Sequence, residues 1–219
     1  MNNLLCKHIL SHFDYISFDI FDTLIERDVN RPSDIFWLTG KNIIDEENAE
    51  EFCKLRKEAE TKARRNNPKM EVTLEEIYNE LDGVYEYSVK EKLKHEEMKL
   101  EVLHCHRKKD MIAFYEKCLE MKKHIVIISD MYMPAELIEK ILNQCNIIGY
   151  EKVYVSNEYS VNKISSELFK IVMKEKQIDP SKIIHIGDSF KADFCGARKA
   201  GIKSILISRK HRLKRLIHS

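Results

Sequence analysis

The sequence predicts an α/β protein with a Rossmann-like, doubly wound parallel sheet and an α-helical insertion after the first strand. Short Ile/Val-rich runs of strand length are apolar on both faces, which is typical of parallel strands buried between helices. In the second half of the chain these runs alternate with amphipathic stretches of helical periodicity, as in βαβ units. The first half, after one such run, is rich in Glu and Lys and has helical periodicity without a convincing strand.

Five runs are expected to form the sheet, because they are rich in Ile and Val and contain no Pro. The first of them precedes the insertion, and the other four follow it. They are residues 14–20, 124–129, 152–156, 183–187 and 203–207.

Helices are expected between the later runs, at residues 134–145 and 165–177. Pro134 stands at the expected first helical position, and two serines precede Glu167 at the second start. The breaks Asn66-Asn67-Pro68 and Asp82-Gly83 divide the insertion. Its helices are expected at residues 33–44, 48–66, 73–81 and 88–109. We therefore expect a core of residues 1–24 and 124–219 and a helical cap of residues 25–123.

The composition restricts the classes of partner. The 37 basic and 36 acidic side chains give a net charge of +1, so no global field recruits nucleic acid or an anionic membrane. The six cysteines form no CxxC pair, which favours reduced thiols and a cytoplasmic location. No stretch approaches the roughly 20 apolar residues of a membrane span. We expect a cytoplasmic protein that binds no nucleic acid and does not span a membrane.

Polar groups follow three of the expected strands. Asp19 follows the first strand, Ser129-Asp130 ends the second, and Gly187-Asp188 ends the fourth. In an open parallel sheet, ligands bind beyond the carboxyl ends of the strands, at a point where the strand order reverses. We therefore expect these groups to converge on one crevice.

In order and spacing, four motifs resemble the haloacid dehalogenase-like superfamily, most of whose members are magnesium-dependent phosphatases. The first motif, a strand followed by Asp-x-Asp-x-Thr, is similar to "SFDIFDTL", where Asp19 and Thr23 fit the pattern. The second is a strand that ends in Ser129, and the third is Lys163 before a helix. The fourth, "IGDSFKADFCGARKAGI", supplies Asp188 and Asp193. The family also places a helical cap between its first and second motifs.

The resemblance implies a role for each of these residues. Asp19 is expected to attack phosphorus and form an aspartyl-phosphate, with Lys163 neutralising the phosphate and the nucleophile. Ser129, Asp130, Thr23 and Lys163 are expected to surround the phosphate. Mg²⁺ is expected to bind Asp19, the backbone carbonyl of Phe21, Asp188 and Asp193. The wording "FDIFDTL" and "SDMY" also resembles a branch associated with bacterial surface-polysaccharide genes, which suggests a phosphorylated sugar as substrate.

Phe21 departs from the family pattern. Alignment with the first motif favours Asp19 over Asp22 as nucleophile, because Asp19 directly follows the strand and Thr23 stands four places after it. Phe21 then occupies the position where most family phosphatases carry the aspartate that protonates the leaving group. Phe21 cannot transfer a proton, so the rate enhancement of about 10²–10⁴-fold that general acid–base catalysis typically gives is put in question. A phosphotransferase or a non-catalytic module that binds a phosphorylated ligand or a partner protein remains an alternative to the phosphatase.

Three further features are interpreted structurally. His104 and His106 lie in an expected helix, where alternate residues point about 200° apart, so we expect no metal site there. Glu97 and Glu101 are expected on a solvated helix face. His185 is expected to be a packed histidine of a strand.

Overall fold

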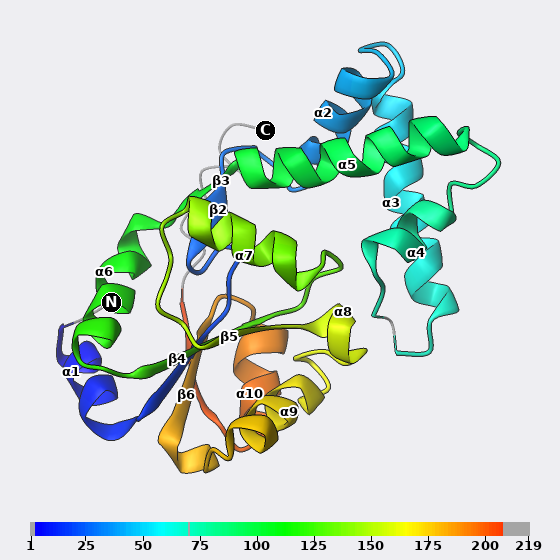
Figure 1. Ribbon diagram of the computed structural model, residues 1–219. Helices are drawn as coiled ribbons and strands as arrows, with labels where there is room; N and C mark the ends of the chain where they lie inside the picture. The colour runs from blue at the N-terminus through cyan, green and yellow to red at the C-terminus, as the bar shows by residue number, and fades with distance from the viewer. Residues whose placement is uncertain (1–2, 70, 208–219) are drawn as a thin grey trace.

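The computed structural model describes residues 3–69 and 71–207, and its centre is a five-stranded parallel sheet (Figure 1). The strand order is β5-β4-β1-β6-β7, with β1 in the middle. In register, Ile16 of β1 lies between Ile125 of β4 and Ile184 of β6. The expected parallel sheet is confirmed. Its strands are β1 (Tyr15–Phe18), β4 (His124–Ser129), β5 (Lys152–Val155), β6 (Ile183–Gly187) and β7 (Lys203–Leu206).

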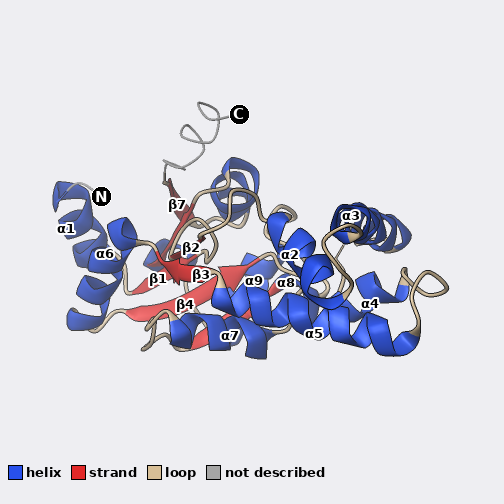
Figure 2. Cartoon of the chain, turned by 90° about the horizontal axis from the view of Figure 1, so that it is seen from above, coloured by secondary structure: helices blue, strands red, loops and turns tan. Residues whose placement is uncertain are grey.

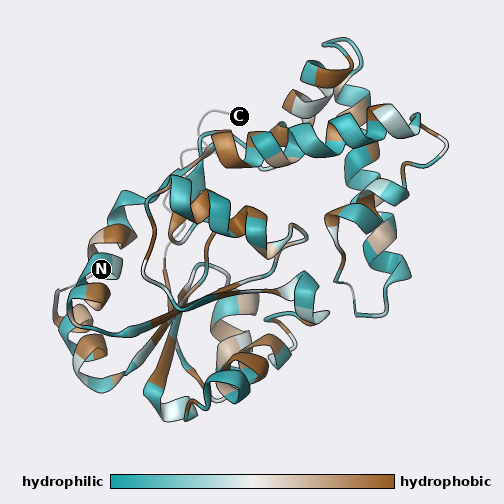
Figure 3. Cartoon of the chain, viewed as in Figure 1, coloured by the Kyte–Doolittle hydropathy of each residue, from teal (hydrophilic) through white to brown (hydrophobic). Residues whose placement is uncertain are grey.

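Helices cover both faces of this sheet (Figure 2). Alternate residues of β4 belong to two separate hydrophobic clusters: Ile125 and Ile127 to one, Val126 and Ile128 to the other. Both faces of the strand are therefore buried, which explains its unbroken apolar run (Figure 3). The helices of the core are α1 (Asn3–His12), α6 (Lys109–Glu120), α7 (Ala135–Gln144), α8 (Ser156–Tyr159), α9 (Glu167–Lys176) and α10 (Ala197–Lys199). A 3₁₀ turn spans Pro180–Lys182, and a π-helical turn spans Phe190–Gly196.

Four helices form a separate layer to one side of the sheet, which we call the cap (Figure 1). They are α2 (Asp34–Ile43), α3 (Ala49–Asn66), α4 (Leu74–Asn79) and α5 (Tyr87–Leu103). A capping box starts α4, because the Thr73 hydroxyl accepts from the Glu76 N–H while the Glu76 carboxylate accepts from the Thr73 N–H. Within residues 3–69 and 71–207, no helix is both long and apolar enough to cross a membrane.

A two-stranded antiparallel ribbon joins the cap to the core. We call β2 (Ile25–Arg27) and β3 (Cys105–Arg107) the hinge ribbon, because both crossings of the chain pass through it. The expected helix over 88–109 is wrong at its end: α5 stops at Leu103, and residues 105–107 form a strand. His104 is the C-cap of α5 and His106 lies in β3, so the helical spacing assumed for these two histidines does not apply.

Two further boundaries differ from those expected. Helix α6 packs against β4 although it lies within the expected insertion, and we therefore propose to end the cap at Leu103. Pro134 lies one position before α7, at its N-cap, rather than at the first helical position.

The interior of the cap is partly ionic. Glu97 and Glu101, expected in solvent, are 0% and 1% exposed. Arg56, which is itself 0% exposed, donates to both carboxylate oxygens of Glu97 at 2.8 and 2.7 Å. Arg27 donates to Glu101 in the same bidentate way, at 2.9 and 3.2 Å. The expected solvated face is therefore wrong: these glutamates are buried because each has a guanidinium partner.

Candidate active site

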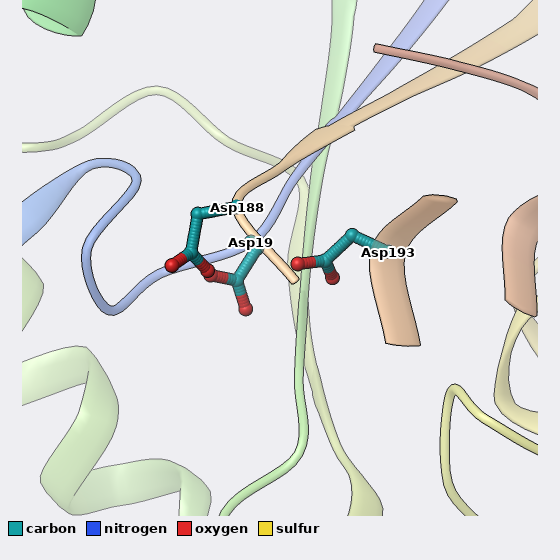
Figure 4. A group of neighbouring side chains, drawn as sticks. All are labelled: Asp19, Asp188 and Asp193. Carbon is teal, nitrogen blue, oxygen red and sulfur yellow. The ribbon is translucent and has the colours of Figure 1, made fainter. Parts of the chain in front are cut away.

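The ends of β1 and β6 bring three carboxylates together. Asp19 directly follows β1, Asp188 directly follows β6, and Asp193 comes from the π-helical turn behind them (Figure 4). One oxygen of each carboxylate lies within 4.8 Å of the others. All three side chains are buried. The convergence of Asp19 and Asp188 follows from the parallel sheet, which places both strand ends at one edge.

Lys163 links two of these carboxylates. Its Nζ lies 2.6 Å from Asp19 Oδ1 and 2.6 Å from Asp193 Oδ1, and the residue is 2% exposed. The backbone N–H of Lys163 donates to Asp130 Oδ1 at 2.9 Å. A Cβ on Gly196 would lie 2.0 Å from the Lys163 carbonyl oxygen, so only glycine allows this close approach. The loop that carries Lys163 is thus fixed at both its N–H and its carbonyl.

Asp193 is held by three groups besides its neighbours in the cluster. Lys163 and His185 Nε2, the latter at 3.1 Å, share Asp193 Oδ1, while the Ser189 N–H donates to Oδ2 at 2.8 Å. His185 is fully buried, and its Nδ1 lies 2.9 Å from the Ser17 hydroxyl. The expectation of a packed histidine is confirmed, but the sequence reasoning missed that this histidine supports Asp193. The register could have indicated it, because Ser17 lies opposite His185 in neighbouring strands.

Burial and charge set the ionisation of this cluster. Desolvation raises the pKa of Asp19, and this effect outweighs the attraction of Lys163. Desolvation would also raise the pKa of Asp193, but Lys163 and His185 hold it below its usual range. Desolvation would lower the pKa of Lys163, yet the Asp19 and Asp193 carboxylates raise it. The lysine therefore stays a cation beside the two carboxylates.

The residues expected around a phosphate lie at the same edge of the sheet. Ser129, the last residue of β4, is 1% exposed, and Thr23 is fully buried. The Thr23 hydroxyl donates to Asp19 Oδ2 at 3.1 Å, so it orients the expected nucleophile. Asp130 accepts from the Lys163 N–H, and desolvation raises the pKa of Asp130 to about 6. These contacts hold Thr23 against Asp19 and Asp130 against the backbone of Lys163.

Phe21 has a cation rather than a carboxylate beside it. The guanidinium of Arg27 lies 4.1 Å from the centre of the Phe21 ring and is held in place by Glu101. Asp22 has φ of 60°, and its carbonyl accepts from the buried ammonium of Lys108. Neither Arg27 nor Lys108 was identified from the sequence, because Arg27 reaches this turn from the hinge ribbon and Lys108 from the residue directly after it.

The cap contacts the loop that carries Lys163. Asn162 Nδ2 donates to Oε1 of Glu71, a cap residue that is 8% exposed, at 3.1 Å. Glu71 also raises the pKa of Asp130, after the larger effect of desolvation, so its charge acts within the site. A cap carboxylate therefore lies next to the loop that carries Lys163.

The carboxylate cluster fits a hard divalent cation. Its donors are oxygens alone, which Mg²⁺ prefers to nitrogen or sulfur. Three aspartates face one lysine, so the buried site carries excess negative charge that a divalent cation would offset. Gly187 leaves room for this arrangement, because a Cβ there would lie 2.3 Å from Asp193 Cγ. Across the described residues 3–69 and 71–207, this is the one group of three or more His, Cys, Asp or Glu residues whose ligand atoms all lie within 4.8 Å of one another.

A comparison with protein-family models found one match. A family model described as haloacid dehalogenase-like hydrolase matches residues 42–207. This range contains Ser129, Lys163, Asp188 and Asp193 and begins after the strand that leads to Asp19. Comparison with curated protein sequences found no match.

Solved structures with similar folds include three hydrolase-fold proteins of low sequence identity. A 2-haloacid dehalogenase of Pseudomonas syringae has a TM-score of 0.62 at 14% identity, covering 94% of this chain and 99% of that one. The protein YfnB of Bacillus subtilis, bound to magnesium, has a TM-score of 0.60 at 17% identity, covering 90% and 87%. A haloacid dehalogenase family enzyme of Bacteroides thetaiotaomicron has a TM-score of 0.62 at 17% identity, covering 95% of this chain and 100% of that one. At such identities the likeness concerns the fold.

Proposed function

Since the chain belongs to the haloacid dehalogenase-like hydrolases, we propose that it is a Mg²⁺-dependent phosphatase of a small phosphorylated metabolite, with Asp19 as nucleophile. The observation that supports this best is the contact of Lys163 with Asp19 and Asp193 beside Asp188. Attack of a carboxylate on carbon does not require further acidic residues such as Asp188 and Asp193. Attack on a phosphate dianion requires cations around the phosphoryl oxygens, and these two residues could help to hold a metal ion there. A sugar phosphate is the substrate that the sequence resemblance suggests.

The proposed reaction has two steps. In the first, an Asp19 oxygen attacks phosphorus, the bond to the ester oxygen breaks, and the leaving alkoxide takes a proton from solvent water. In the second, water attacks phosphorus of the aspartyl-phosphate and gives a proton back to solvent, the bond between phosphorus and the Asp19 oxygen breaks, and inorganic phosphate and free Asp19 are released. Thr23 orients Asp19 through its 3.1 Å hydrogen bond. Lys163 offsets the charge of nucleophile and phosphate, and Ser129 donates to a phosphoryl oxygen.

Asp19, Asp188 and the carbonyl of Phe21 would hold Mg²⁺, with Asp193 direct or as a support. Bound there, the ion would neutralise the phosphate and help to align it for attack. Asp193 suits the supporting role, since both of its oxygens already accept hydrogen bonds from the protein.

Phosphoryl transfer to an acceptor other than water is the second candidate, and Phe21 is the observation that favours it. An aromatic ring under Arg27 cannot activate water, so the aspartyl-phosphate would be long-lived enough to meet another acceptor. If the lack of an acid–base group at Phe21 prevented turnover altogether, the protein would only bind a phosphorylated ligand. We also propose a cytoplasmic location, in keeping with the six free cysteines.

The test is phosphate release from phosphorylated sugars, nucleotides and an aryl phosphate, with and without Mg²⁺. Asp19→Asn should abolish release, whereas Asp22→Asn is the matched control, because Asn tolerates the positive φ found at Asp22. Halide release from 2-haloacids is measured in parallel. Halide release without phosphate release would overturn the proposal. Phosphate mimics that bind with Mg²⁺ without turnover would favour transfer or ligand binding.

A further inference from the structure

The exposed face of the hinge ribbon carries two histidines and two carboxylates. Glu26 of β2 lies opposite His106 of β3, and the Asp28 N–H donates to the His104 carbonyl at 3.0 Å, which continues the pairing. Residues that oppose each other across a ribbon share a face. These four side chains therefore lie on one face. Buried Ile25 and Cys105 lie on the other.

One carboxylate is placed between two imidazoles. His104 Nδ1 lies 2.6 Å from Asp28 Oδ1, and His106 Nε2 lies 2.9 Å from Asp28 Oδ2. The side chains of His104, Asp28 and His106 are 23%, 49% and 55% exposed, so an ion in solution can reach all three. Desolvation is the largest single effect and raises the pKa of Asp28, but the hydrogen bonds from His106 and His104 together hold that pKa below its usual range.

We propose that Asp28, His104 and His106 form a binding site for a borderline transition-metal ion such as Zn²⁺. Two imidazole nitrogens and carboxylate oxygens are a donor set that suits Zn²⁺, Co²⁺ and Ni²⁺ and does not suit Mg²⁺. The cluster of Asp19, Asp188 and Asp193 offers oxygen alone. The protein thus has two sites of opposite metal preference.

The ion-free geometry shows what binding would change. The two ring nitrogens contact different oxygens of Asp28 and do not yet converge on one point. Both rings now donate to Asp28, because a carboxylate can only accept. Binding would replace these two hydrogen bonds, and each neutral ring would carry its proton on its other nitrogen. Because the ribbon contains both crossings between core and cap, the ion would brace the hinge.

The first experiment measures Zn²⁺ binding by competition with a chromophoric chelator. The background variant Asp19→Asn/His8→Gln/His12→Gln weakens the catalytic cluster and removes the histidine pair of α1, whose rings lie 4.1 Å apart. We expect one equivalent of Zn²⁺ to bind this background, and excess Mg²⁺ not to displace it. Circular dichroism without metal establishes that each variant is folded.

Two single changes then locate the site. His106→Gln and Asp28→Asn, both at exposed positions, should each weaken Zn²⁺ binding by at least about tenfold. The matched control is His95→Gln, an exposed histidine of α5 whose ring contacts the Glu91 carbonyl, and it should change nothing. With both histidines present, bound Co²⁺ should show the visible absorption of a site with nitrogen ligands. This absorption should be lost when His106 is changed to Gln. The proposal is overturned if the background binds no Zn²⁺, or if binding survives both changes. None of these readouts depends on phosphatase activity.

Discussion

The hydroxyl of Tyr132 donates a hydrogen bond to Glu97, 3.3 Å away, and so joins the loop after β4 to the ion pair inside the cap. The same loop accepts a hydrogen bond from the cap, since the Leu74 N–H lies 2.8 Å from the Tyr132 carbonyl. Glu97 also accepts from Tyr78 at 2.8 Å and from Arg56. The cap is therefore fixed to the core next to Ser129, and the buried carboxylate of Glu97 takes part in this connection.

Changing Glu97 to Gln should destabilise the protein by about 3 kcal/mol, because Arg56 then remains buried without its main counter-charge. The free energy of unfolding in urea measures this. The matched control is Glu58→Gln, which removes a partner 4.0 Å from Lys54 on the surface and should cost less than about 0.5 kcal/mol. Equal costs for the two variants would mean that the buried pair contributes no more than a surface pair.

Gly187→Ala should weaken Mg²⁺ binding by at least about tenfold, because its Cβ would displace Asp193 from the cluster. Calorimetric titration with Mg²⁺ measures the affinity. Gly83→Ala is the control: Gly83 has φ of +80° and nothing within 4 Å of the new Cβ, so it should cost about 1 kcal/mol of stability without changing Mg²⁺ affinity. The same Mg²⁺ affinity in both variants would contradict the role given to Asp193.

Asp130→Asn should stabilise the protein at neutral pH. Burial raises the pKa of Asp130 from 3.8 to about 6, so the folded state binds its proton more tightly than the unfolded state does. This group therefore lowers stability as the pH rises from about 4 to about 6, and the loss stays constant above that range. Asn keeps the acceptor for the Lys163 N–H and removes the charge. We expect a gain of about 1–3 kcal/mol at pH 7.5 and none at pH 3.5.

Denaturant unfolding of wild type and Asp130→Asn at several pH values gives this profile directly. A stability difference that did not change between pH 4 and pH 7 would show that Asp130 titrates normally in the folded protein.

Phe21→Asp should accelerate turnover of the best phosphate ester by at least about tenfold, since it restores a proton donor and acceptor beside the leaving group. Phe21→Asn is the control, because it has the size and polarity of Asp without the proton transfer. Steady-state rates and the burst of phosphoenzyme separate the two chemical steps. Equal rates in both variants would place the limiting step elsewhere, or would indicate that Arg27 neutralises the new carboxylate.

The strands of the sheet could be predicted closely because burial on both faces leaves an unbroken apolar run. The run at 124–129 coincides with β4, and the run at 183–187 coincides with β6. The hinge ribbon could not be predicted in this way, since strands of three residues have no measurable periodicity. Its pairing depends on the antiparallel approach of segments that are far apart in sequence.

The sequence predicted which residues belong to the candidate site better than it predicted which side chains contact one another. Asp19 and Asp188 meet because parallel strands end at one edge, which a strand pattern can predict. The burial of Glu97 and Glu101 depends on arginines 41 and 74 positions away, and no local pattern encodes such pairs. A glutamate on a charged helix therefore looks solvated until its partner is known.

The ends of the cap meet at a single hydrogen-bonded pair, the Asp28 N–H and the His104 carbonyl, 3.0 Å apart. A short turn joining these two positions would close the hinge ribbon into an ordinary hairpin without altering the register of the sheet. In evolution, a unit attached in this way can be lost, enlarged or exchanged as a module. Under the proposed function, selection could then vary substrate choice through the cap while the edge of the sheet that carries Asp19 and Asp188 stays the same.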